Sequence, residues 1–238
     1  MKIVLPALGA WALSMQASHA EPVQFKADDG VTIDGDYQGD GAGPIILLFH
    51  QASANRHEYD PIAPRLNALG FDTLAIDQRA GGGLFDHPNE TAKGHVGSFI
   101  AALADLEAAL AWSKDKSSAR LVWGSSYSAA LVFLLAAKRP DDVAAVLAFS
   151  PGEYLGGASD VKDAAAKVQV PVFITSSSDG DEVKAAKVIS DAAASTNKVQ
   201  FVPKHGVHGS STLRKDANKK GSEENWQAVE SFLAGLTG

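Results

Sequence analysis

The sequence predicts an α/β protein, with a mostly parallel sheet of about seven to eight strands and helices on both faces. Two observations support this prediction. From residue 45 to the end of the chain, short apolar segments typical of strands alternate with longer segments of helical periodicity. The segment 45–49, Ile-Ile-Leu-Leu-Phe, is apolar at every position, which is the pattern of a strand buried on both faces. Strands connected through helices usually pair in parallel, so helices are expected to cover both sides of the sheet.

Length and composition favour one domain. The chain has 238 residues, of which 45% are hydrophobic and 21% charged, and these proportions argue against disorder. The formal net charge is −7 and no basic stripe stands out, so nucleic acid is a poor candidate partner. The chain contains no cysteine, which excludes disulfide bonds, a thiol nucleophile and thiolate metal sites together.

The first twenty residues have the pattern of a secretory signal peptide. Lys2 gives a positive start, residues 3–13 form a short apolar core, and residues 18–20, Ser-His-Ala, form a small-x-small cleavage site. The apolar core is too short to span a membrane. We therefore expect cleavage near Ala20, a single mature domain of residues 21–238 without membrane insertion, and a location in the periplasm or outside the cell.

The elements expected along the chain follow from local patterns. Residues 22–27 and 31–37 look like two strands joined by an Asp-Asp-Gly turn, so the sheet should begin with an antiparallel hairpin. Later strands are expected at 71–76, 121–123, 143–149, 171–175 and 198–202. Helices are expected at 58–69, near 97–113, directly after residue 128, at 181–195, and after a Ser222 cap, with a Gly- and His-rich loop at 77–93.

The segment 124–128, Gly-Ser-Ser-Tyr-Ser, is the point around which the rest of the site is arranged. It joins a short apolar strand directly to a helix, and such a sharp turn needs small residues two positions before and two after its apex. With Ser126 at the apex, Gly124 and Ser128 are those small residues. Ser125 as the apex would require a small residue where Tyr127 stands. The pattern therefore indicates Ser126 as a nucleophile.

A serine nucleophile needs a base, and the base needs an acid that orients it. His208 lies in the loop after the last expected strand and is the expected base, with His205 as the alternative. Asp179 is the first carboxylate after the strand at 171–175 and is the expected acid. The acids left open as alternatives are Asp181, Glu182 and Glu153.

Backbone amides at the same edge of the sheet should bind the oxyanion. The amide of Tyr127 follows the expected nucleophile, and the amide of Ala52 is preferred to that of Gln51 in the turn after residue 49. His50 is interpreted as a structural, packed histidine. The residues expected to line the substrate site are Gln51, Glu153 and Tyr154, with Tyr127 beside them.

The sequence resembles the α/β-hydrolase superfamily over nearly all of residues 30–236. The resemblance is carried by the turn at 48–52, the Asp-Gln-Arg-Ala-Gly-Gly segment at 77–82, the turn at Ser126, and the late Asp179 and His208. Within the superfamily the chain looks most like small dienelactone-hydrolase-like carboxylesterases without a large cap. It departs from the usual pattern in having Ser128 where the turn usually ends in Gly, and Gln51 where His-Gly is usual.

This resemblance implies a serine hydrolase that cleaves carboxylic esters through a Ser-His-Asp triad in the order Ser126, Asp179, His208. It implies no cofactor, and a small-molecule or surface-displayed ester as the partner. A peptidase or amidase, a dienelactone-type hydrolase and a non-catalytic binding protein are the alternatives. His87 and His95, near Asp86 and Glu90, are interpreted as scattered loop residues rather than as a metal site.

Overall fold

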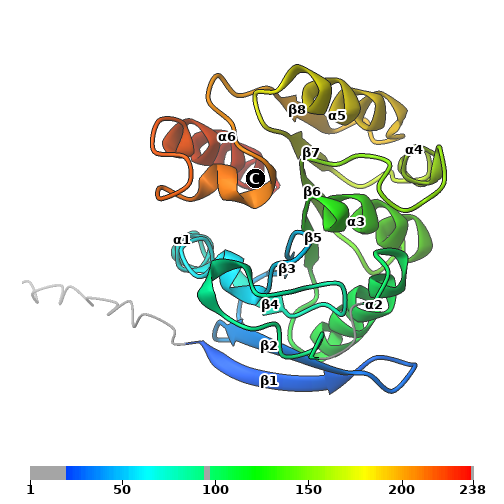
Figure 1. Cartoon of the computed structure of the whole chain (residues 1–238), viewed down its shortest axis with the longest axis vertical. Coiled ribbons are helices and arrows are strands. Elements are labelled where there is room, and N and C mark those ends of the chain that lie inside the picture. The colour runs from blue at the N-terminus through cyan, green and yellow to red at the C-terminus, as the bar shows by residue number, and fades with distance from the viewer. Residues whose placement is uncertain (1–19, 94–96, 237–238) are drawn as a thin grey trace, which may run out of the picture.

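In the computed structural model, which describes residues 20–93 and 97–236, eight strands form one sheet in the order β1-β2-β4-β3-β5-β6-β7-β8 (Figure 1). The strands are β1 (Glu21–Lys26), β2 (Thr32–Gln38), β3 (Ile45–Phe49), β4 (Asp72–Ile76), β5 (Arg120–Ser125), β6 (Ala145–Phe149), β7 (Val172–Thr175) and β8 (Lys198–Phe201). β1 pairs antiparallel with β2 and β2 with β4, and every later pairing is parallel. The predicted fold class is confirmed. Residues 1–19, which hold nearly all of the expected signal peptide, lie outside the described residues.

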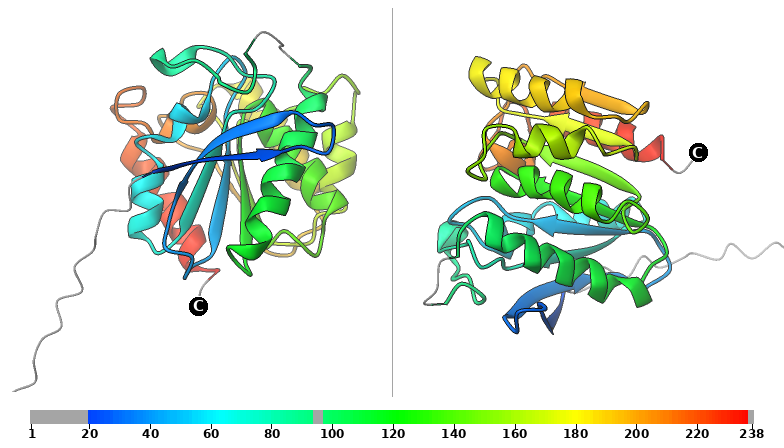
Figure 2. Two further views of the ribbon diagram at one scale, coloured as in Figure 1. Left: turned by 90° about the horizontal axis from the view of Figure 1, so that it is seen from below. Right: turned by 90° about the vertical axis from the view of Figure 1, so that its right-hand side faces the viewer.

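Helices cover both faces of this sheet. The α-helices are α1 (Ala63–Ala68), α2 (Leu103–Trp112), α3 (Tyr127–Lys138), α4 (Asp160–Ala165), α5 (Gly180–Ala192) and α6 (Ser222–Ala234). Short 3-10 turns are η1 (Arg56–Tyr59), η2 (Leu84–Asp86), η3 (Ile100–Ala102), η4 (Ser113–Asp115) and η5 (Gly209–Leu213). Helices α1 and α6 lie on one face, and α2 to α5 lie on the other (Figure 1; Figure 2, right). Figure 2 (left) shows the β1–β2 hairpin in front at one end of the sheet.

The alternation of side chains along the buried strands creates two cores. In β3, Ile45, Leu47 and Phe49 face the core under α2 to α5, while Ile46 and Leu48 face the core under α1 and α6. All five side chains are fully buried. Successive residues of a strand point to opposite faces, so an uninterrupted apolar run is what a sheet with two covered faces requires.

The strand register brings several strand ends to one edge of the sheet. Phe49 at the end of β3 lies opposite Gly124 of β5, and Ser125 lies opposite Phe149 at the end of β6. Phe149 in turn lies opposite Thr175 at the end of β7. The residues that follow these strands therefore meet along a single edge, where open α/β sheets build their sites.

Some elements differ from the expected ones. Helix α4 lies between β6 and β7, where no helix was expected, and the helix expected at 58–69 is divided into η1 and α1. Ser222 is the first residue of α6 rather than a capping side chain, and the cap position is Gly221. Among the described residues, none of the helices combines the length and the apolar composition that crossing a bilayer requires.

Candidate active site

Ser126 stands at the apex of the turn between β5 and α3 with φ +59° and ψ −119°. Residues other than glycine rarely adopt a positive φ, because this backbone conformation is strained. The strain persists only where the surrounding structure stabilises it. Here the Ser126 amide donates to the carbonyl of Phe149 at 2.8 Å, and its own carbonyl begins α3 by accepting from Ala129. The turn lifts the Ser126 side chain to the edge of the sheet, and the residue is partly exposed.

The two small residues of this turn have different tasks. A Cβ at Gly124 would lie 2.3 Å from the carbonyl oxygen of Ser128, so only glycine fits there. Ser128 is fully buried, and its hydroxyl donates to the carbonyl of His50 at 2.6 Å and accepts from the side chain of Gln78 at 2.8 Å. The hydroxyl that replaces the more usual glycine thus ties α3 to the end of β3.

His208 lies within hydrogen-bond reach of Ser126. Its Nε2 is 2.8 Å from Oγ of Ser126, although the two residues are far apart in the sequence. His205, the alternative base, is exposed, and its carbonyl accepts from the side chains of Asn218 and Asn225. Of the two histidines considered, the structure brings His208 to the serine.

The acid beside His208 is Glu182, and the expectation of Asp179 was wrong. Oε1 of Glu182 lies 3.0 Å from Nδ1 of His208. Asp179 is exposed and caps α5 instead, because its Oδ1 accepts from the amides of Asp181 and Glu182. The first turn of α5 carries Glu182 back toward the sheet edge, where the longer side chain reaches the imidazole. Asp181 is exposed and pairs with Lys184.

This pair shifts both pKa values in the direction that favours charge. The hydrogen bond with Glu182 is the main cause that raises the pKa of His208, against the opposing effect of burial. Burial alone would raise the pKa of Glu182, but hydrogen bonds with His208, Ser150 and the Ser177 amide, together with the charge of His208, lower it to about 2. An ionised Glu182 fixes the proton on Nδ1 of His208 and leaves Nε2 free to accept the Ser126 proton.

Beneath the serine lies a buried acid that the sequence analysis did not single out. Glu58 is fully buried, and its Oε1 accepts from the hydroxyl of Ser125 at 2.8 Å. Its Oε2 accepts from the amide of Gln51 at 2.8 Å, and the Ser125 hydroxyl accepts from the amide of Ser210 at 2.8 Å. Burial raises the pKa of Glu58 to about 7, against these hydrogen bonds and the charges of Arg214 and His208. The Glu58 carboxyl group thus connects the turn after β3 with the turn at Ser126, and the Ser125 hydroxyl extends this connection to the loop of His208.

The turn after β3 is held by His50, as a structural histidine would hold it. His50 is fully buried; its Nε2 accepts from the amide of Gln78 at 2.9 Å, and its Nδ1 lies 2.7 Å from the carbonyl of Gln51. Burial lowers the pKa of His50 to about 4, so the ring is neutral. Because the Gln51 amide donates to Glu58, it is not available to an oxyanion. Ala52, the next residue, is partly exposed.

Glu153, Tyr154 and Tyr127, which were expected to line a substrate site, have different surroundings in the structure. The carboxylate of Glu153 accepts from the amides of Val161 and Lys162 and so caps α4, which corrects its expected role as a substrate ligand. Tyr154 is 36% exposed, donates to the carbonyl of Ser150, and lies close enough to Glu182 for that charge to help burial raise its pKa. On the other side, the ring of Tyr127 is buried against Phe99, with ring centroids 4.5 Å apart.

Comparison with known proteins supports the fold and a hydrolytic family. The family model described as serine aminopeptidase, S33 (Hydrolase_4), matches residues 42–152. The chain is also similar to the 2-(acetamidomethylene)succinate hydrolase of Mesorhizobium japonicum, with 36% identity over 115 residues. That match covers 48% of this chain and 38% of the relative.

Several solved structures match over nearly the whole length of the chain. An esterase of Pyrococcus furiosus superposes with a TM-score of 0.72 at 19% identity, covering 100% of this chain and 99% of the other. The dienelactone hydrolase of Anabaena variabilis superposes with a TM-score of 0.71 at 16% identity, covering 92% and 98%. The sheet order, the sharp turn at Ser126 and these likenesses together show that the chain has the α/β-hydrolase fold. Between β6 and β7, the described residues form the short helix α4 and no large cap domain.

Proposed function

We propose that this protein is a serine hydrolase that cleaves carboxylic esters through an acyl-enzyme intermediate. The observation that best supports the proposal is the unbroken line of contacts from Oγ of Ser126 to Nε2 of His208 and from Nδ1 of His208 to Glu182. These three groups come from three different strand ends and meet at one edge of the sheet. This is the arrangement of nucleophile, base and orienting acid that acyl transfer requires.

In the first half of the reaction, Nε2 of His208 takes the proton of Ser126 as Oγ attacks the acyl carbon. The carbonyl oxygen becomes an oxyanion, for which we assign the amides of Tyr127 and Ala52 as donors. Tyr127 is the first residue of α3, and the first amides of a helix lack partners within the helix. We assign Ala52 because the amide of Gln51, the residue before it, already donates to Glu58. The imidazolium then gives its proton to the departing alcohol oxygen, and the acyl group stays on Ser126.

In the second half, His208 takes a proton from water as the water oxygen attacks the acyl carbon. The second oxyanion collapses, the bond to Oγ of Ser126 breaks, and His208 returns the proton to the serine. The carboxylate of Glu182 stabilises the imidazolium in both halves. The reaction consumes one water molecule and releases an alcohol and a carboxylic acid, and it needs no group beyond these side chains and amides.

A carboxylic ester is the substrate class we favour, and small or surface-displayed esters fit the site best. Helix α4 has only six residues, and Tyr154 at the rim is 36% exposed. The esterase and the dienelactone hydrolase that share the fold support the same choice. An open site of this kind should hydrolyse short acyl chains better than long ones.

Amide hydrolysis is the second candidate, because the matching family model is described as a serine aminopeptidase. The two candidates are separated by comparing a p-nitrophenyl ester with the p-nitroanilide of the same acid. A higher kcat/KM on the ester supports the esterase, and a higher value on the anilide supports the peptidase. In either case Ser126→Ala should reduce kcat on the order of 10⁴- to 10⁶-fold with the fold unchanged. Full activity in that variant would end the proposal.

We further propose that the protein is exported. The pattern at residues 1–20 supports this, with cleavage after Ala20. N-terminal sequencing of the protein recovered from a bacterial periplasm or culture medium tests it. A mature protein that begins at Glu21 supports export, and an intact Met1 in a cytosolic fraction contradicts it.

A further inference from the structure

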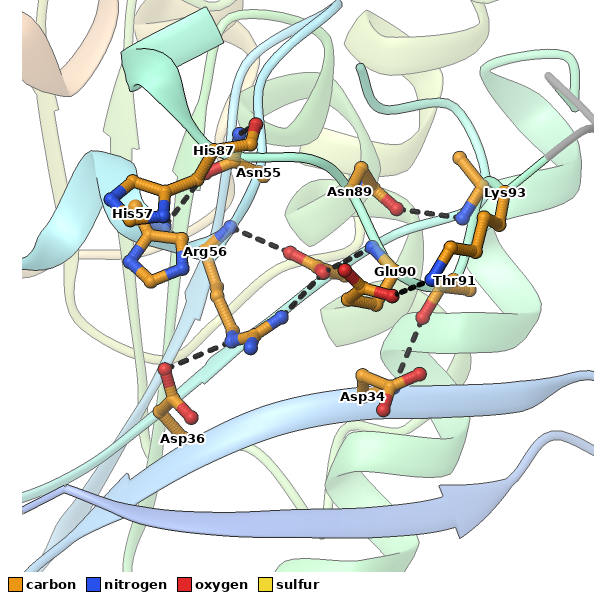
Figure 3. A network of polar contacts seen from close by, with 12 residues as sticks. Asp34, Asp36, Asn55, Arg56, His57, His87, Asn89, Glu90, Thr91 and Lys93 are labelled. Carbon is orange, nitrogen blue, oxygen red and sulfur yellow. Dashed lines mark hydrogen bonds and ion pairs between the residues drawn. The ribbon is translucent and has the colours of Figure 1, made fainter. Parts of the chain in front are cut away.

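Two histidines and one aspartate meet at a corner of the molecule formed by η1 and η2, outside the proposed active site. Figure 3 shows the two histidines, His57 and His87, side by side. The rings of His57 and His87 stack with their centroids 3.8 Å apart and their planes inclined by 22°. The carboxylate of Asp60 lies 3.0 Å from Nδ1 of His57. One potential ligand atom from each residue lies within 4.8 Å of the other two. Imidazole nitrogens and carboxylate oxygens are ligands that zinc binds in proteins.

A buried asparagine fixes the backbones that carry the two histidines. Asn55 is fully buried, and its Oδ1 accepts from the amide of His57 at 3.0 Å. Its Nδ2 donates to the carbonyl of His87 at 2.6 Å, and Figure 3 shows the three residues together. The histidines are distant in the sequence, so bringing them together reduces the conformational entropy of the chain between them. Folding has already brought them together before any ion binds. Asn55 therefore holds the backbones of the two histidines close together.

The other side of the corner is held by Arg214. Its Nη1 donates to the carbonyls of His57 and Glu58, at 3.3 and 2.9 Å, and its guanidinium lies 4.5 Å from the centre of the Phe85 ring. Phe85 belongs to η2, the segment that precedes His87. Asn55 and Arg214 thus contact both segments from two directions.

The charge and exposure of the cluster suit a hydrated cation. Among residues 20–93 and 97–236, no ion pair joins Asp60 to a lysine or arginine, and the pair that its carboxylate does form is with His57. The side chain of Asp60 is 60% exposed and that of His57 is 20% exposed, and His87 is exposed. An ion could enter from solvent, and water could complete its coordination.

We propose that His57, Asp60 and His87 form a binding site for a divalent transition-metal ion, with zinc as the best fit. Nδ1 of His57 and the Asp60 carboxylate lie 3.0 Å apart as a hydrogen-bonded pair, and a widening to about 3.4 Å would let a tetrahedral ion replace the shared proton and bind both at about 2.1 Å. His87 must turn out of the stack and move on the order of 1 Å, which its exposed side chain can do by rotation about χ1 and χ2. His95, the other histidine considered in the sequence analysis, lies outside the described residues.

Isothermal titration of the tag-free protein with zinc chloride tests the proposal, with native mass spectrometry to count bound ions. We expect one ion per chain, and an affinity at least about tenfold lower in His57→Ala, Asp60→Asn and His87→Ala. His205→Ala is the matched control, because His205 is an exposed histidine away from the cluster, and it should bind like the parent protein. Magnesium and calcium, which prefer all-oxygen sites, should not compete.

A second measurement protects against variants that fold poorly. Zinc should raise the Tm of the parent protein and of His205→Ala, and the shift should be lost in His87→Ala, whose side chain is exposed. Absence of saturable binding, or equal affinity in His87→Ala and the parent, would overturn the proposal. Binding that survives in His87→Ala and disappears in His208→Ala would place the ion at the active site and also overturn it. Ester hydrolysis by His87→Ala should remain unchanged, so the metal site and the proposed function can fail separately.

Discussion

Glu58 and Ser125 share a hydrogen bond of 2.8 Å directly below the nucleophile, at a place where both side chains are fully buried. The same carboxyl group binds the amide of Gln51, and the same hydroxyl binds the amide of Ser210. These contacts fix the relative position of the proposed oxyanion turn, the nucleophile and the loop of His208. Glu58 is thus a positioning residue, and a charge buried there has measurable consequences.

Replacement of Glu58 by Gln should change how stability depends on pH. Burial raises the pKa of Glu58 from 4.5 to about 7 in the folded protein, so the folded state binds more protons than the unfolded state between those values. The stabilisation from the protonated carboxyl is complete below about pH 4.5 and is lost as the pH rises through about 7. Glu58→Gln cannot ionise, so relative to this variant the parent protein should lose on the order of 1–3 kcal/mol between pH 4.5 and pH 8.

Urea denaturation of both proteins at pH 4.5, 6 and 8 measures this difference. Glu230→Gln is a suitable control, since Glu230 lies on the surface of α6 and pairs with Arg65 at 2.7 Å. Parallel stability curves for the parent and Glu58→Gln across this range would show that Glu58 does not titrate there.

Replacement of Glu182 by Gln should lower activity and shift its pH dependence. The Glu182 carboxylate raises the pKa of His208, so its removal should lower that pKa. The base must be neutral to act, and the acidic limb of the kcat/KM profile should therefore move to lower pH, while the plateau falls on the order of 10²- to 10⁴-fold.

The matched control is Asp179→Asn, which alters the acid that caps α5 and leaves the contact between Glu182 and His208 in place. We expect that variant to lose stability of about 1 kcal/mol or less while retaining most of its activity. A larger loss of kcat/KM in Asp179→Asn than in Glu182→Gln would reverse the assignment of the acid.

Replacement of Gly124 by Ala should destabilise the protein, because the new Cβ would lie 2.3 Å from the carbonyl oxygen of Ser128. Backbone cannot move away as a flexible side chain would, and we expect a loss of roughly 1–3 kcal/mol together with lower activity. Gly180→Ala is the matched control, since a Cβ there meets nothing within 4 Å in α5. In thermal unfolding, Gly124→Ala should lower the Tm relative to the parent protein, and Gly180→Ala should not. Equal Tm values in the two variants would contradict the close approach at Gly124.

Local patterns were sufficient to predict much of the fold. The apolar run at 45–49, the hairpin around Gly30 and the small residues at 124 and 128 each reflect a constraint that acts over a few residues, and each element lies where the sequence placed it. Helix α4 was missed because it has only six residues and is capped by Glu153, whose contact depends on the tertiary fold.

The partners within the site were harder to predict, because they depend on which helix face turns toward the sheet edge. Asp179 directly precedes the expected helix, where an N-cap residue stands, and this position could have assigned it to the cap and so removed it from the candidate acids. Glu58 stands four residues before Ile62, on the apolar side of the expected helix, which was the available signal for a buried acid. No local pattern could have joined His57 to His87, because Asn55 brings them together across a long loop.

Reaction with a fluorophosphonate probe, followed by mass spectrometry of the intact protein and its peptides, tests most directly whether Ser126 is an activated nucleophile. Only a serine whose proton is taken by a neighbouring base reacts at an appreciable rate. We predict one adduct per chain, located at Ser126, with labelling absent in Ser126→Ala and strongly slowed in His208→Ala. A folded parent protein that takes up no probe, or an adduct that persists in Ser126→Ala, would contradict a hydrolase built on this serine.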